Sequence, residues 1–209
     1  MSSTVGAGSI LKVLSDQHAR TRELLCLVAD GKGPDRRAAF DALRRVLAVH
    51  EAAEDFVLRP AAHTVIPRSV VKAHLEDERR LGEMIEHLER LDLDGNDFQD
   101  AFFSFSEELI AHMWSQEAEE WHPLELRWSD EEQSRLGAWL YRAFAPDPAN
   151  PTARTSDRAV PAGSVARLSS ADIARLEYRA LFQEAVDRLA ESRWRDERSR
   201  YFETAPVAA

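Results

Sequence analysis

Apolar residues recur at three- and four-residue spacing along most of the first 145 residues, which is the pattern of amphipathic helices. Glycine- and proline-containing breaks divide this pattern into four long segments, at about 9–30, 34–61, 67–91 and 98–120. A shorter helix is expected to start at Ser129, because Ser129 and Glu132 have the spacing of a capping box. Strand patterns are nearly absent. The sequence therefore predicts an all-α protein, built as an up-down four-helix bundle with an additional C-terminal helical extension.

The composition changes after this region. Residues 146–169 contain Pro146, Pro148, Pro151 and Pro161 among small polar residues, which predicts an exposed linker. Apolar spacing returns in the final segment, where a helix is expected from about 171 to 199. We therefore divide the chain into a bundle with a short following helix (1–145), a linker (146–169) and a C-terminal helix and tail (170–209). The last helix could cover the bundle or form a homodimer.

Charge and cysteine content narrow the class of protein. The 209 residues carry a formal net charge of −10, which argues against nucleic acid or an anionic membrane as the main partner. No run of about 18 apolar residues predicts a membrane span, and the first residues do not resemble a signal peptide. The single cysteine, Cys26, fits a reducing cytoplasm, and its place in the apolar run 24–28 predicts a buried position.

Each of the four long segments places one histidine on its apolar face: His18, His50, His74 and His112. Two of them are followed four residues later by a glutamate, Glu54 and Glu78, and this spacing puts both side chains on one face of a helix. A carboxylate that points into a core needs a hydrogen bond, a cation or a metal ion. Bundles that hold two metal ions use such inward-facing Glu and His side chains.

A single inward histidine is more often a core residue hydrogen-bonded to a carbonyl group than a ligand, and a His–Glu pair arises easily by chance. The joint pattern is different, because four separate explanations would have to coincide in one core. The remaining histidines, His63, His87 and His122, lie off the apolar faces and are expected to be exposed. The sequence therefore favours a metal site made by all four helices.

These motifs resemble those of the hemerythrin family, in its bacterial HHE cation-binding branch, over about residues 9–125. The similarity rests on His18 in Asp-Gln-His-Ala-Arg, on His50-Glu-Ala-Ala-Glu54, on His74-Leu-Glu-Asp-Glu78 and on His112 with Glu117. The resemblance implies a four-helix bundle that binds two iron ions, with manganese or a mixed pair as the alternative. It implies the ligands His18, His50, Glu54, His74, Glu78, His112 and Glu117.

Two positions depart from the oxygen-carrying members of that family. Glu78 stands where those proteins have a fifth histidine, which moves the site toward carboxylate-rich oxidases and away from reversible oxygen carriage. Glu117 lies five residues after His112, about 140° around an ideal helix. Glu119 and Glu120 are rivals for its role, and Gln116 occupies the four-residue position.

Three functions remain open at this point. The first is a non-haem di-iron protein that binds or senses O₂, NO or peroxide, or stores iron. The second is a di-iron oxidase, oxygenase or peroxide-decomposing enzyme with a small-molecule substrate, so enzymatic activity stays open. The third is a metal-free helical interaction module. Metal content separates the third from the other two, and kinetics with O₂ or peroxide separates the first from the second.

Overall fold

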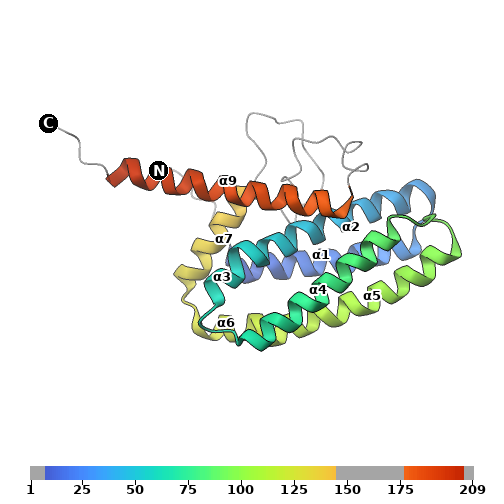
Figure 1. The fold of residues 1–209 in the computed structure, drawn as a ribbon, viewed down its shortest axis with the longest axis horizontal. Coiled ribbons are helices and arrows are strands. Elements are labelled where there is room, and N and C mark those ends of the chain that lie inside the picture. Colours follow the sequence, from blue (N-terminus) through green and yellow to red (C-terminus); the bar gives the residue numbers. More distant parts are fainter. Residues whose placement is uncertain (1–7, 145–176, 205–209) are drawn as a thin grey trace.

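The computed structural model describes residues 8–144 and 177–204. Within this part of the chain, four long helices lie side by side and alternate in direction (Figure 1): α1 (Ile10–Asp30), α2 (Gly33–Ala53), α4 (Arg68–Leu88) and α5 (Asn96–Gln116). Short turns join α1 to α2 and α4 to α5, so neighbouring helices are antiparallel. The predicted all-α, up-down four-helix bundle is confirmed. No described helix is long and apolar enough to cross a membrane.

Two of the four helices continue through a short π-helical segment. After α2 the chain runs through η1 (Glu54–Leu58) into α3 (Arg59–Ala62), and the Arg59 amide donates to the Glu54 carbonyl oxygen, five residues back. After α5 it runs through η2 (Glu117–Trp121) into α6 (His122–Arg127), where the His122 amide donates to the Glu117 carbonyl oxygen. Such segments widen one turn, change which residues face inward and are frequent at functional sites.

Two further helices pack against the bundle. The short helix α7 (Asp130–Phe144) begins at the predicted capping box, in which Ser129 N donates to Glu132 Oε2 at 3.0 Å and Glu132 N donates to Ser129 Oγ at 3.2 Å. The C-terminal helix α9 (Tyr178–Thr204) lies along α2 and reaches α7 (Figure 1). Its residues Tyr178 and Leu181 are buried in the bundle's core. The predicted linker, 146–169, lies outside the described residues.

The core has two apolar parts with a polar centre between them. One part, at the α1–α2 turn, includes Leu43, Phe98 and Phe105. The other, at the opposite end, includes Ile10, Leu14 and Leu124. The histidines predicted from the sequence lie between these parts along every helix. Apolar packing on both sides therefore holds the helices that carry the polar residues and excludes water from them.

The α1–α2 and α4–α5 turns lie at the same end of the bundle, and Arg36 connects them. Gly33 adopts φ +52°, a conformation that favours glycine, and it starts α2 beside α1. Arg36 is buried and donates to the carbonyl oxygens of Val28, at 3.1 Å, and of Leu93, at 2.7 Å. These bonds tie the α1–α2 turn to the α4–α5 turn.

The prediction that Cys26 is buried is wrong. Its neighbours Leu25 and Val28 face the core, whereas Cys26 is exposed. One step along a helix turns a side chain by about 100°, so a residue within an apolar run can still lie on the outer face.

Candidate metal centre

The four histidines predicted to point inward are buried in the middle of the bundle. The exposed fraction is 1% for His18, 5% for His50, 1% for His74 and 7% for His112. They come from α1, α2, α4 and α5, one from each helix. His63, His87 and His122 are exposed. The structure therefore separates the histidines as the apolar pattern of the sequence does.

The rings of His18 and His50 face each other through their Nε2 atoms, which are 3.1 Å apart. The opposite nitrogen of each ring contacts an oxygen that can only accept: His18 Nδ1 lies 2.8 Å from Glu117 Oε1, and His50 Nδ1 lies 3.0 Å from Gln17 Oε1. Both Nδ1 atoms therefore carry the proton of the neutral ring, which leaves a lone pair on each Nε2. Two lone pairs that face each other repel unless a cation lies between them.

Burial keeps these rings neutral. It lowers the pKa of His50 from 6.5 to about 3, with a smaller effect of His112. It lowers the pKa of His112 to about 4, with His74 adding to the effect, and it lowers the pKa of His18 as well, with His50 adding. Neutral imidazole is the form that binds metal ions. The site therefore presents ring nitrogens as ligands and not as cations.

Two buried carboxylates lie between the histidine pairs. Glu54 Oε1 is 3.5 Å from His50 Nε2, and Glu78 Oε1 is 3.6 Å from His112 Nε2. Gln116 joins them, because its Nε2 amide donates to Glu54 Oε2 at 2.6 Å and to Glu78 Oε1 at 3.3 Å. Glu54 and Gln116 are fully buried. This chain of contacts links the α1–α2 half of the centre to the α4–α5 half.

The α4–α5 half is formed by His74, His112 and Asp77. One ligand atom from each lies within 4.8 Å of the others, which is a spacing that fits a metal ion. Asp77 approaches His112 from the outer side, with Oδ2 4.0 Å from Nδ1. Neither ring nitrogen of His74 has a hydrogen-bond partner among the described residues. A buried imidazole without partners is unfavourable, and a metal ion would satisfy it.

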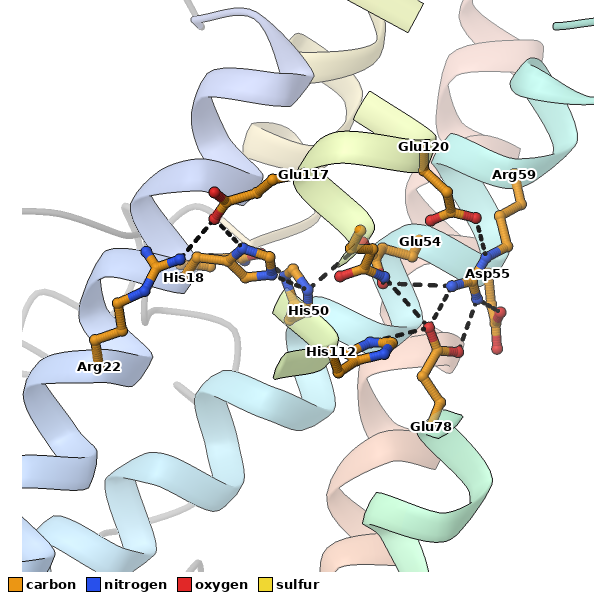
Figure 2. Close-up of polar contacts among 12 residues, drawn as sticks. His18, Arg22, His50, Glu54, Asp55, Arg59, Glu78, His112, Glu117 and Glu120 are labelled. Carbon is orange, nitrogen blue, oxygen red and sulfur yellow. Dashed lines mark hydrogen bonds and ion pairs between the residues drawn. The ribbon is translucent and has the colours of Figure 1, made fainter. Parts of the chain in front are cut away.

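An arginine also lies inside the centre. Arg59 is 9% exposed and contacts four carboxylates (Figure 2). It donates to both oxygens of Glu78, with Nη1 2.9 Å from Oε2, and to Asp55 Oδ1 at 2.6 Å. Glu54 Oε2 lies 3.6 Å from its Nη2, and Glu120 Oε1 lies 3.5 Å from its Nε.

The carboxylates outnumber this cation. Burial alone would lower the pKa of Arg59, but the carboxylates around it, Glu54 first, raise it overall, so the guanidinium stays charged. Burial raises the pKa of Glu78 to about 7 against the opposing effect of Arg59. Burial also raises the pKa of Glu54, again against Arg59. Burial therefore favours the neutral forms of these carboxyl groups even beside Arg59, and a further cation would stabilise their charged forms.

The three glutamates that follow α5 lie in three different places. Glu117 contacts the outer nitrogen of His18 and also accepts from Arg22 Nη2 at 2.7 Å, on the opposite side of His18 from His50 (Figure 2). Glu119 is largely exposed, with Oε2 3.8 Å from His74 Nε2. Glu120 is buried beside Arg59. The structure thus brings six of the seven predicted ligands toward the inner space and places Glu117 behind His18.

Sequence reasoning missed the parts played by Gln17, Arg59 and Asp77 and gave Gln116 only a position. Gln17 and Gln116 each stand one residue before a predicted ligand, and a neutral amide gives no sequence signal of a role in a metal site. Arg59 is five residues after Glu54, which at about 100° per residue is the wrong side of an α-helix. The π-helical turn of η1 brings it inward. A buried arginine after a His–Glu motif is a signal that only the structure reveals.

A cleft of about 300 Å³ reaches the centre from the surface between α2, α4 and α9. Glu78 and Asp55, both partners of Arg59, are among the residues that line it. Glu51 and two residues of α9, Tyr178 and Phe182, line the wall. The extension after the bundle therefore helps to form an approach to Glu78.

The donor set fits metal ions such as iron or manganese. Ring nitrogens and carboxylate oxygens suit both metals. Nitrogen ligands about 2.1 Å from one ion and about 90° apart lie about 3 Å from each other, and the Nε2 atoms of His18 and His50 are 3.1 Å apart. His74, at the other end of the centre, has two ring nitrogens that need a partner.

Comparisons with known proteins agree with this geometry. No curated protein sequence matches the chain significantly. Among solved structures, the crystal structure of a Hemerythrin HHE cation binding domain-containing protein from Mycobacterium kansasii is similar, with a TM-score of 0.59 and 23% sequence identity over 64% of this chain and 83% of that one. At this identity the similarity supports the fold. Residues 9–124, more than half of the chain, match the Hemerythrin HHE cation binding domain family, and the chain belongs to that family.

Proposed function

We propose that this protein is a non-haem di-iron protein that binds or activates O₂, NO or peroxide at the centre of its helical bundle. The observation that carries the proposal is the pair His18 and His50, whose Nε2 atoms face each other at 3.1 Å in a buried site. Hydrogen bonds from the outer nitrogens fix these tautomers, as is usual for histidines that bind metal ions. A cytoplasmic setting is part of the proposal.

Each group has a distinct role in this proposal. The ligands are the ring nitrogens of the four buried histidines and the carboxylates of Glu54 and Glu78. Gln17 and Glu117 hold His50 and His18 from outside through hydrogen bonds, and the Asp77 carboxylate lies 4.0 Å from the outer nitrogen of His112. Direct binding by Glu117, which the family resemblance implies, stays a prediction. When bound, the metal ions supply the redox chemistry, while the apolar core on both sides excludes water.

A second candidate is an enzyme: a di-iron oxidase or oxygenase, or a peroxide-decomposing catalyst. It is favoured by the cleft of about 300 Å³ that ends at Glu78, since this volume admits a small organic molecule as well as a diatomic gas. The residues that line this cleft include the charged Glu51 and Arg79 and the apolar Leu75 and Phe182. Turnover of peroxide or consumption of O₂ with a co-substrate distinguishes this candidate from a binding protein.

Metal content is the first test. Protein reconstituted with Fe²⁺ without oxygen is expected to hold about two ions per chain by elemental analysis. Replacing His50 with Ala should remove at least one ion, while replacing the exposed His87 with Ala should remove none. Less than half an equivalent of iron in the natural protein, or equal loss in both variants, would contradict the proposal. Mixing the loaded protein with O₂, NO or H₂O₂ in a stopped-flow spectrometer then identifies the ligand.

A further inference from the structure

Arg59 is a buried, charged part of the centre to which the proposed function gives no role. It brings a permanent positive charge into the space between the two proposed carboxylate ligands, because it pairs with both oxygens of Glu78 and lies 3.6 Å from Glu54. A metal ion held by Glu54 and Glu78 needs the same oxygen atoms. It would also lie close to a like charge in a buried setting, where repulsion is strong.

The four carboxylates around Arg59 fall into two groups. Glu54 and Glu78 face the histidines and are proposed ligands. Asp55 and Glu120 do not contact any of the four buried histidines in the described structure. Asp55 accepts from Arg59 Nη1 at 2.6 Å, and Glu120 Oε1 lies 3.5 Å from Arg59 Nε. The guanidinium thus has partners on both sides, and it remains paired through Asp55 and Glu120 if it releases the other two.

We propose that Arg59 is a resident cation that competes with metal for Glu54 and Glu78. Without metal, Arg59 balances the buried carboxylates and keeps the bundle folded. With metal bound, it gives up Glu54 and Glu78 and keeps Asp55 and Glu120. Arg59 therefore weakens metal binding and makes the fold less dependent on metal. The inference rests on the proposed metal site but concerns a residue that the site itself does not require.

The local structure supports a fixed role for this side chain. The π-helical turn of η1 ends at Arg59, whose amide bonds to the Glu54 carbonyl oxygen, so the two residues lie on one side of the helix. Pro60 follows directly, within the first turn of α3, where proline fixes the backbone. The guanidinium is therefore delivered to Glu54 by the backbone and is not a surface side chain that folded in by chance.

The experiment compares Arg59→Gln with the natural protein. The amide of glutamine keeps hydrogen-bonding capacity but removes the charge. Arg59→Lys keeps the charge but loses the two-pronged contact with Glu78. Arg79→Gln is the matched control, because Arg79 is an exposed arginine that pairs with Glu83 at the surface. The probe is Fe²⁺ under anaerobic conditions, titrated against a chromophoric chelator, with thermal unfolding followed with and without Fe²⁺.

Arg59→Gln is expected to bind Fe²⁺ about tenfold more tightly or better, because a buried like charge and a competitor for two ligands are both removed. Its metal-free form should melt at a lower temperature than the natural protein, and Fe²⁺ should raise the melting temperature by more. Arg59→Lys should bind Fe²⁺ with intermediate affinity. Arg79→Gln should match the natural protein in both measurements.

Other results would overturn the proposal. If Arg59→Gln binds Fe²⁺ equally or more weakly while the natural protein binds it, Arg59 supports the ligands and does not compete. If Arg59→Gln folds only with Fe²⁺, the proposal is supported. If Arg59→Gln does not fold at all, Arg59→Lys decides: tighter Fe²⁺ binding than in the natural protein supports the proposal, and equal or weaker binding overturns it. If only Arg59→Gln binds Fe²⁺, Arg59 competes and the proposed function fails. If neither binds it, both proposals fail.

Discussion

Replacing His74 with leucine tests whether the buried centre is arranged for a metal ion and lowers the stability of the metal-free protein. His74 is 1% exposed, and neither of its ring nitrogens has a hydrogen-bond partner among the described residues. The nearest carboxylate oxygen, in Glu119, is 3.8 Å away, too far for a hydrogen bond. Leucine has a similar volume and no polar atoms, so it removes both unsatisfied groups without leaving a large cavity.

The magnitude follows from the two nitrogens. Leaving one buried polar group without a partner costs about 1–3 kcal/mol, so removing both returns about 2 kcal/mol at the lower end. The difference in shape between histidine and leucine disturbs the packing of the core and offsets up to about 1.5 kcal/mol of this gain. In a chain of this size each kcal/mol shifts the melting temperature by about 2–4 °C. A net gain of about 0.5–2 kcal/mol therefore predicts that His74→Leu melts about 1–8 °C above the natural protein in the presence of a chelator.

The assay is thermal unfolding in chelator and again with Fe²⁺, together with elemental analysis of iron. The variant should gain less from Fe²⁺ than the natural protein and should hold at least one ion fewer. The exposed His87 is the control, and His87→Leu should change the free energy of unfolding by no more than about 0.5 kcal/mol. A His74→Leu protein that melts well below the natural one in chelator, or that keeps its full iron content, would refute the reasoning.

Three further predictions concern two residues near the centre and one at the turns of the bundle. Glu117→Gln should leave the iron content unchanged but lower Fe²⁺ affinity by about 10–100-fold, because Glu117 holds His18 from outside; loss of a whole equivalent would make it a ligand. Burial raises the pKa of Glu51 from 4.5 to about 8, so its contribution to stability is lost as pH rises through this range. Glu51→Gln should therefore be more stable than the natural protein above about pH 8 in urea unfolding, with the difference shrinking toward acid. Arg36→Ala should lower the free energy of unfolding by about 2–4 kcal/mol, because it leaves the Val28 and Leu93 carbonyl oxygens without their buried donor.

The helices and the inward histidines could be predicted because both depend on the regular period of an α-helix. His18, His50, His74 and His112 each continue the apolar face of a helix, and all four are buried in the structure. Periodicity reports which face a residue shares with its neighbours, and in an antiparallel bundle that face has only one interior to enter. The same reasoning placed Glu54 and Glu78 in the core, and both are buried.

The failures occur where the period changes or where only distant contacts decide. Cys26 lies in an apolar run but on the outer face of α1. The expected start of the last helix, at about 171, lies outside the described residues, and the packing of α9 (Tyr178–Thr204) along α2 depends on contacts that a local pattern does not encode. Metal binding by Glu117 stays a prediction from the family resemblance, and the position of its carboxylate behind His18 depends on the contact with Arg22 from another helix.

The π-helical turn at Glu54 explains why the centre holds a cation that the sequence did not predict. In a regular α-helix Arg59 would lie about 140° from Glu54 and would face away from the carboxylates. The bond from the Arg59 amide to the Glu54 carbonyl oxygen closes a turn over five residues instead, so both side chains enter the same space. Glu54, a proposed ligand, thus also begins the turn that brings Arg59 into the centre, where we propose that Arg59 competes with the metal ion. If Arg59 is the resident cation that we propose, the metal affinity of this centre is set by the local winding of α2 as much as by the ligands themselves.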